Sequence, residues 1–179
     1  LMVNNSCFYR KYVFAEDSPI NRATALIISK AIQQPFFTEM RTNQQLGYIV
    51  WSYLRNLDET IYLNFLIQSG EYSADELNKR ANSFIAGASE LLSSMDEDTY
   101  QKLIESSIEE IEKRPMSISE RASKLRSLIF EHNVDYERDK KTIESLKQLT
   151  KTEVVGKLEI VTSEKSRKML NILTFAENH

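Results

Sequence analysis

Residues 41–50, RTNQQLGYIV, combine side chains that could do chemistry with a backbone suited to holding them. Arg41 carries a permanent positive charge and Tyr48 a phenol, and both side chains donate hydrogen bonds. The polar residues 42–45 can bond to their own backbone in a turn. Gly47 is expected to adopt a backbone conformation that other residues resist. The stretch therefore predicts a cation and a phenol at the place where a helix runs into a strand of a sheet.

Arg41 is predicted to end a helix and Tyr48 to open a strand. The helix begins at Ser18 and Pro19, because serine is a good cap and proline fits the first turn. Pro35 is expected to kink or interrupt this helix, since it lacks the N–H group of a helical hydrogen bond. On these residues alone, the simpler interpretation is structural. Arg41 would then be a cation at the helix C-terminus, and Tyr48 a half-buried tyrosine of the sheet.

Four apolar segments have the composition of strands, namely residues 6–15, 47–56, 60–69 and 168–176. In the third, every second residue from Ile61 to Ile67 is apolar, and a short polar link at Asp58 and Glu59 predicts an antiparallel hairpin with the second. Strands and helices do not alternate regularly, so a doubly wound parallel sheet is not expected. The order predicts a single α+β domain over residues 1–179, an antiparallel sheet with helices packed on one face.

Residues 73–161 have the pattern of helices with short breaks. Three capping boxes, in which a hydroxyl and a glutamate each accept a free backbone N–H, mark predicted helix starts. They are Ser73 with Glu76, Ser117 with Glu120, and Thr150 with Glu153. The apolar stripe predicted after the first is Leu77, Ala81, Phe84, Ala88, Leu91 and Met95. A shorter helix carries the periodic residues Ala122, Leu125 and Ile129.

Composition excludes several classes of protein. Of the 179 residues, 41% are hydrophobic and 27% charged, which is a globular balance. The net charge of −3 gives no electrostatic reason to expect nucleic acid or an anionic membrane surface. No apolar run is long enough for a membrane span. The chain begins with Leu1 before Met2 and is expected to be part of a longer protein, so the compartment stays open between periplasm and cytoplasm.

Metal and nucleophile motifs are missing from the sequence. His132 and His179 have no partners at the spacing of an H-E-x-x-H or H-x-x-E-H zinc motif, and Cys7 is the single cysteine. A zinc site made by this segment alone is therefore not expected. We interpret His132 as a residue matching the dipole at a helix end, His179 as an unstructured last residue, and Cys7 as a small buried strand residue. No G-x-S-x-G, P-loop or G-x-G-x-x-G pattern occurs.

The pattern R-T-x-x-Q-L-G-Y-I-V at residues 41–50, with Phe37 before it, resembles the insulin-degrading enzyme and pitrilysin family of inverted-motif zinc metalloproteases. The similarity extends through the hairpin to residues 65–69 and, less specifically, through the later helices. Almost the whole chain aligns in order with the last quarter of such a protease. The resemblance implies an insulinase-like domain, the C-terminal domain of a larger multi-domain enzyme.

In that family, two halves of similar α+β domains close around a peptide, and the first domain holds the zinc. The resemblance implies that Arg41 and Tyr48 reach across the closed chamber, Tyr48 to stabilise the oxyanion and Arg41 to orient the substrate. It implies zinc in the parent protein and none in this segment, which should not hydrolyse peptides alone. The implied partners are peptide substrates and the N-terminal catalytic half, with no nucleic acid and no membrane.

A second hypothesis remains open. The family includes members that lost catalysis and only hold substrate, so the chain could belong to a non-catalytic homologue. It could also be a module that binds peptide along a strand edge. An H-x-x-E-H motif upstream in the coding sequence would separate these alternatives from a peptidase.

Overall fold

The computed structural model describes the chain except for residues 1–3, 132–133, 166–167 and 178–179, so the predictions for His132 and His179 lie outside the described residues. The elements in order are β1 (Ser6–Glu16), α1 (Pro19–Phe37), the π-helical turn η1 (Thr38–Asn43), β2 (Ile49–Leu57), β3 (Thr60–Ser69), α2 (Ala74–Ser93), α3 (Glu97–Glu112), α4 (Ile118–Glu131), α5 (Arg138–Gln148), α6 (Lys151–Thr162) and β4 (Met169–Thr174).

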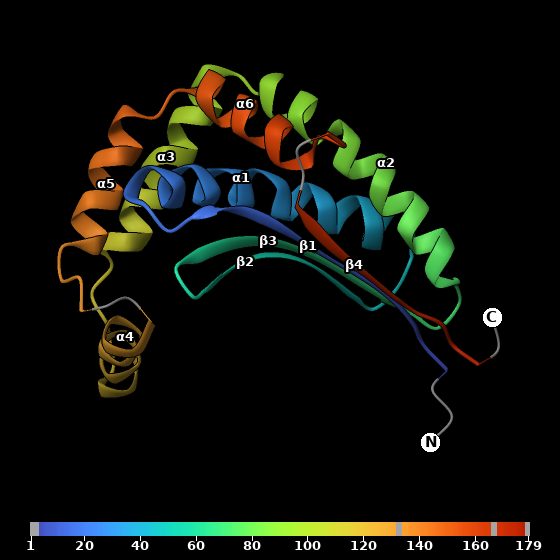
Figure 1. Cartoon of the computed structure of the whole chain (residues 1–179). Helices are drawn as coiled ribbons and strands as arrows, with labels where there is room; N and C mark the ends of the chain where they lie inside the picture. The colour runs from blue at the N-terminus through green and yellow to red at the C-terminus, as the bar shows by residue number, and fades with distance from the viewer. Residues whose placement is uncertain (1–3, 132–133, 166–167, 178–179) are drawn as a thin grey trace.

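The four strands form one antiparallel sheet in the order β2-β3-β1-β4. The sheet is bowed, with helices α1, α2, α3, α5 and α6 on its convex side and α4 beyond its end, so the molecule has the shape of an arch (Figure 1). At the β2–β3 turn, Asp58 and Glu59 have φ values of 47° and 58°. Positive φ at both central residues is the type I′ conformation, whose twist matches that of paired strands. The predicted hairpin and α+β fold are therefore confirmed.

The core lies between the sheet and the helices. Along β1 and β3, alternate side chains are buried against the helices, as strand geometry requires. The largest of these buried side chains are Phe8, Tyr12, Ile61, Leu63, Phe65 and Ile67. Helix α1 crosses the sheet and is buried along most of its length, with Ile27, Ile28, Ile32 and Phe36 fully inaccessible. In the part of the chain that the structure describes, no helix lies on the opposite face of the sheet (Figure 1).

Helix α1 starts as predicted and continues further than predicted. The Ser18 hydroxyl accepts from the Asn21 N–H, and Pro19 is the first helical residue. Pro35 does not interrupt the helix, which was one of the two expected effects. The chain instead passes into a wider π turn after Phe37.

The three predicted capping boxes differ in outcome. Thr150 and Glu153 form the complete reciprocal pair. At Ser73 only the hydroxyl contributes, because the Glu76 carboxylate pairs with Arg80 instead. The side chain of Glu120 accepts from the N–H of Met116 rather than from the cap residue. In the two incomplete boxes, the glutamate carboxylate thus binds a nearby arginine or another backbone N–H in place of the N–H of the cap residue.

Three burial predictions need correction. On α2 the stripe passes through Ile85 and Leu92, each one position after the predicted Phe84 and Leu91. The buried residues of this helix are Ala74, Leu77, Ala81, Ile85, Ala88 and Leu92. Cys7 is only half-buried, since it lies on the sheet face without helices. Helix α4 buries none of its described residues, and Leu125 and Ile129 are largely exposed, because the helix extends away from the core (Figure 1).

Candidate functional site

The π turn η1 fixes the position of Arg41. Its wide spacing is seen in the bond from the Gln44 N–H to the Glu39 carbonyl, five residues back, at 3.0 Å. Within the turn, Glu39 accepts side-chain hydrogen bonds from Gln44 at 2.7 Å and from Asn43 at 2.8 Å. Those bonds hold the pKa of the Glu39 carboxyl below its ordinary value. The buried Met40 anchors the turn to the core, so the backbone that carries the Arg41 side chain is fixed in place.

Gly47 positions Tyr48 by allowing two chain segments to approach closely. A Cβ atom on Gly47 would lie 1.9 Å from the backbone oxygen of Gln68 on β3. The predicted reason for this glycine was an unusual φ angle, and that reason is wrong, since none of the glycines has positive φ. The left-handed residue of the segment is Gln45, at φ 52°. Close approach is the second common use of glycine in a backbone.

The structure brings Arg41 and Tyr48 together. The Arg41 Nη1 donates to the backbone oxygen of Tyr48 at 2.9 Å. The guanidinium carbon lies 4.7 Å from the centre of the Tyr48 ring and 5.2 Å from the centre of the Phe37 ring. Both distances are within the range of cation–π attraction. The guanidinium is therefore held between two aromatic rings at the point where β2 begins.

Tyr48 faces outward, and Arg41 beside it is partly exposed. The Tyr48 side chain lies on the surface, and the residue is 80% exposed, which contradicts the interpretation of a half-buried sheet tyrosine. Among the described residues, no carboxylate lies within ion-pair distance of Arg41. A guanidinium without an internal carboxylate remains available to an oxygen atom of another molecule or domain.

A cavity of about 390 Å³ adjoins this site between α1 and β2. It is lined by Phe37, whose ring also contacts the Arg41 guanidinium, and by Gln33, Gln34 and Ser52. The Ser52 hydroxyl oxygen is buried and has no hydrogen-bond partner in the described part of the chain. Sequence reasoning missed this position, although a serine among the inward-facing residues of an apolar strand was a visible signal.

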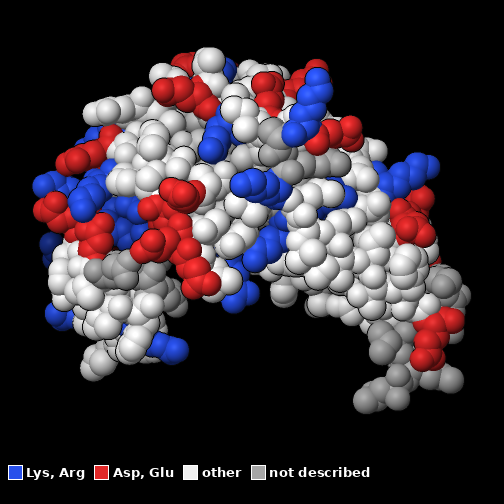
Figure 2. All heavy atoms as spheres, in the orientation of Figure 1, with Lys and Arg blue, Asp and Glu red and all other residues white. Residues whose placement is uncertain are grey.

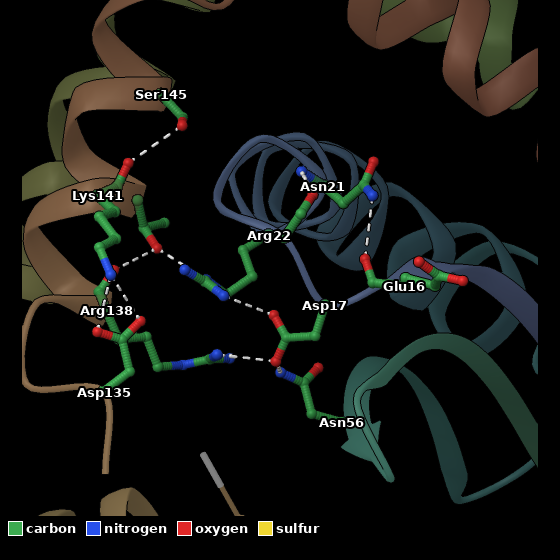
Figure 3. A network of polar contacts seen from close by, with 11 residues as sticks. Glu16, Asp17, Asn21, Arg22, Asn56, Asp135, Arg138, Lys141 and Ser145 are labelled. Atoms are coloured by element: carbon green, nitrogen blue, oxygen red, sulfur yellow. Dashed lines mark hydrogen bonds and ion pairs between the residues drawn. The ribbon is translucent and has the colours of Figure 1, made fainter. Parts of the chain in front are cut away.

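A second arginine cluster fastens α5 to the turn between β1 and α1 (Figure 3). Asp17 accepts from Arg22 at 2.7 Å and from Arg138 at 2.8 Å, and the Arg22 Nε donates to Thr142 at 2.9 Å. Burial raises the pKa of Asp17, but hydrogen bonds and charge from the two arginines outweigh it, so the pKa lies below its ordinary value. We call these four residues the Asp17 cluster. The Arg22 Nη2 is buried without a partner among the described residues.

Charged side chains of both signs are interspersed on the face seen in Figure 2, without a large region of one sign. The described residues contain no group of three or more His, Cys, Asp and Glu side chains placed to hold a metal ion. In the same part of the chain, no helix has the length and apolar run needed to cross a bilayer. The chemistry that this site can offer is hydrogen-bond donation and positive charge from Arg41 and Tyr48.

Comparison with known proteins agrees with the motif at residues 41–50. The family model "PQQ synthase PqqF-like, C-terminal lobe domain 4" matches residues 27–126. The insulin-degrading enzyme of Mus musculus is 30% identical over 155 residues, which are 86% of this chain and 15% of that protein. The chain thus spans about one-seventh of that relative's length. The predicted resemblance to the insulin-degrading enzyme and pitrilysin family is confirmed.

Solved structures share the fold. Pitrilysin superposes with a TM-score of 0.82 and 22% identity, over 95% of this chain and 18% of that one. An inactive peptidase domain from Bordetella parapertussis superposes with a TM-score of 0.72 and 10% identity, over 97% of this chain and 95% of that one. At these identities the likeness concerns the fold alone. The arch with helices on one face of the sheet is therefore found both within a long protein and as a chain of similar extent.

Proposed function

This chain belongs to the family of PqqF-like C-terminal lobe domains, and from that premise we propose that it is the C-terminal domain of a zinc metalloendopeptidase. In this proposal the domain helps to close a chamber around a peptide. It contributes Arg41 and Tyr48 to an active site whose metal lies in another domain of the same polypeptide. The observation that carries the proposal is the contact between an exposed tyrosine and a partly exposed arginine whose guanidinium pairs with no carboxylate among the described residues.

The chemistry fits peptide hydrolysis. Attack on a peptide carbonyl builds negative charge on its oxygen, and donors aimed at that oxygen stabilise the transition state more than the substrate. The exposed phenol of Tyr48 is free to donate to such an oxygen, while the aromatic rings of Phe37 and Tyr48 hold the guanidinium of Arg41. Since Tyr48 is exposed and Arg41 beside it is partly exposed, these groups would act only when another domain approaches. Catalysis would then depend on closure of the chamber.

In this proposal, zinc is bound by another domain of the same polypeptide. The described residues offer no set of ligands that fits it. The proposal therefore gives this chain no role in binding the metal, and it expects the 179-residue segment to be inactive by itself. Peptides and the N-terminal half of the same polypeptide are the proposed partners.

Replacing Tyr48 with phenylalanine tests the proposal. In the full-length polypeptide, Tyr48→Phe should lower kcat on a peptide substrate about 10²–10³-fold, the usual cost of losing one oxyanion donor. Thermal stability and bound zinc should not change, because the side chain makes no buried contact. Tyr136→Phe is a matched control, since Tyr136 is 73% exposed and lies between α4 and α5, far along the chain from the site. Unchanged turnover in Tyr48→Phe would reject the proposed role.

A non-catalytic homologue is the second candidate function. The same fold occurs in an inactive peptidase domain from Bordetella parapertussis, so the fold by itself does not imply hydrolysis. In that case the full-length polypeptide would bind peptides but show no chelator-sensitive hydrolysis. A peptidase assay with and without a zinc chelator separates the two candidates, whatever the result with Tyr48→Phe.

A further inference from the structure

The face of the sheet opposite the helices carries a continuous aromatic and aliphatic surface. We infer that this open face binds peptide segments rich in large apolar and acidic side chains. The inference rests on the proposed function, because it describes where a peptide held at Arg41 and Tyr48 would continue. The open face lies on the inner side of the arch, opposite α1 and the other helices (Figure 1).

The strand register places the apolar side chains of the open face in rows. Trp51, Leu66, Tyr9 and Ile172 are successive pairing partners across β2, β3, β1 and β4. Trp51 is 56% exposed and Ile172 45%, and Leu170 in the neighbouring row is 52% exposed. Single exposed apolar residues are common on any protein, whereas contiguous apolar surfaces mark sites of interaction. The four-residue row therefore points to a binding surface.

The next row shows how the Tyr9 ring of the open face is held. At its centre, Asn64 is fully buried, and its side-chain oxygen accepts from the Tyr9 hydroxyl at 2.8 Å. The Asn64 amide nitrogen lies 3.3 Å from the backbone oxygens of Tyr53 and Tyr62. The amide thus ties the Tyr9 ring to the neighbouring strands. Rings fixed before binding lose little conformational entropy when a peptide packs on them.

Charge defines the second property of the ligand. In the four rows of the described sheet that contain Ile49, Trp51, Tyr53 and Arg55, the charged open-face residues are Lys11 and Arg55, and no carboxylate is present. Glu16 follows only in the next row, at the hairpin end. The chain as a whole has a net charge of −3, so this lack of carboxylates is a local property. A surface with cations and no anions favours acidic partners.

The open face adjoins the proposed site at the edge strand β2. This strand begins at Ile49, directly after Tyr48, and it places the side chains of Ile49 and Trp51 on the open face. A peptide bound at Tyr48 can therefore pass around the edge of the sheet onto the apolar rows. An occupant with both apolar and acidic side chains would match the rows and the two cations.

Binding can be followed on this chain because Trp51 is its single tryptophan. Four synthetic peptides of equal length would combine apolar or polar residues with acidic or basic ones. Titration should shift the emission of Trp51, and the apolar acidic peptide should bind at least about tenfold more tightly than the polar basic one. Similar affinities for all four peptides would overturn the inference. This comparison uses the unmodified chain and does not depend on any variant folding.

Two variants locate the binding. Charge reversal by Lys11→Glu together with Arg55→Glu should turn the preference toward the basic peptides. The matched reversal Lys102→Glu with Lys140→Glu, on exposed positions of α3 and α5, should leave it unchanged. An unchanged preference after the first reversal would show that the peptide binds elsewhere, which overturns the inference.

Apolar contact is tested in the same assay. Ile172→Ser should weaken binding of the apolar peptides roughly fivefold, whereas Ile20→Ser, on the helical side and 48% exposed, should not. If the apolar acidic peptide binds this chain but not the full-length polypeptide, another domain covers the open face and the inference is wrong.

The outcomes separate this inference from the proposed function, because the titration measures binding without hydrolysis. If Tyr48→Phe keeps full turnover while the peptide preferences hold, the catalytic role fails and the open face remains a peptide site. If Tyr48→Phe loses turnover while all four peptides bind alike, the catalytic role stands and the inference about the open face fails.

Discussion

Two clusters in this chain place arginine side chains near a helix end, and they differ in whether a carboxylate balances the charge. In the Asp17 cluster, Arg22 and Arg138 share one buried carboxylate and join elements distant in the sequence. At the candidate site, Arg41 donates to a backbone oxygen and contacts two aromatic rings, and no described carboxylate lies within ion-pair distance. The comparison teaches that the partner of an arginine, more than its position in a helix, distinguishes a structural cation from one available to a ligand.

Removing the shared carboxylate should have the largest effect on stability. Asp17→Asn would leave two mostly buried guanidinium groups without their counter-ion, which typically costs about 3 kcal/mol. Urea unfolding of the variant should show this loss. If the free energy of unfolding falls by less than about 1 kcal/mol, the Asp17 cluster does not have the stabilising role that distinguishes it from the candidate site.

Gly47→Ala should affect both stability and the site. The added methyl group would meet the Gln68 backbone oxygen, so β2 and β3 must separate at a cost of about 2 kcal/mol. Turnover of the full-length polypeptide should also fall, because Tyr48 follows directly and would be displaced. Gly87→Ala is the matched control, since a Cβ atom there meets nothing within 4 Å. Equal stability of the two variants would contradict the close-approach explanation.

Arg41→Lys sharpens the contrast between the clusters. A lysine keeps the charge but lacks the planar group that stacks between two rings, so kcat/KM of the full-length polypeptide should fall roughly tenfold. Stability should change by less than about 0.5 kcal/mol, as for a surface substitution. The paired variant Arg22→Lys should do the reverse, lowering stability and leaving kcat/KM unchanged. If both variants lose stability alike, the two arginines have the same structural role.

Acid should weaken the Asp17 cluster, and this effect is expected to be the smallest. Because the folded-state pKa of Asp17 lies below its ordinary value of about 3.9, its stabilising effect is complete above that pH. It is lost as the pH falls through the lower, folded-state pKa. The stability difference between wild type and Asp17→Asn should therefore stay constant above about pH 4 and narrow as the pH falls below it. Arg41 keeps its charge throughout this range.

The fold could be predicted from local patterns because alternation and caps act over short distances. The hairpin, the helix start at Ser18 and the capping box at Thr150 all depend on residues within a few positions of each other. The Asp17 cluster could not be predicted, since it joins residues more than a hundred positions apart. Nor could the exposure of α4, because periodicity shows that a helix has an apolar side but not what covers it.

The site was found from its residue types, while the structure supplied the reasons for its geometry. The sequence indicated Arg41 and Tyr48 together, and the structure places them in contact. The stacking of Arg41 on Phe37 depends on the π turn, which no propensity signalled. The role of Gly47 was assigned to the wrong cause, because close approach depends on β3, a strand that begins thirteen residues later.

The π turn at Thr38–Asn43 has a consequence for insertions and deletions. An α-helix advances each residue by about 100° around its axis, so the removal of one residue between Phe37 and Arg41 would allow an ordinary helix to continue. The shortened helix would be regular and well bonded. The guanidinium of Arg41 would nevertheless rotate about a quarter-turn away from Tyr48. A sequence one residue shorter could therefore keep this domain's architecture and lose the contact between Arg41 and Tyr48.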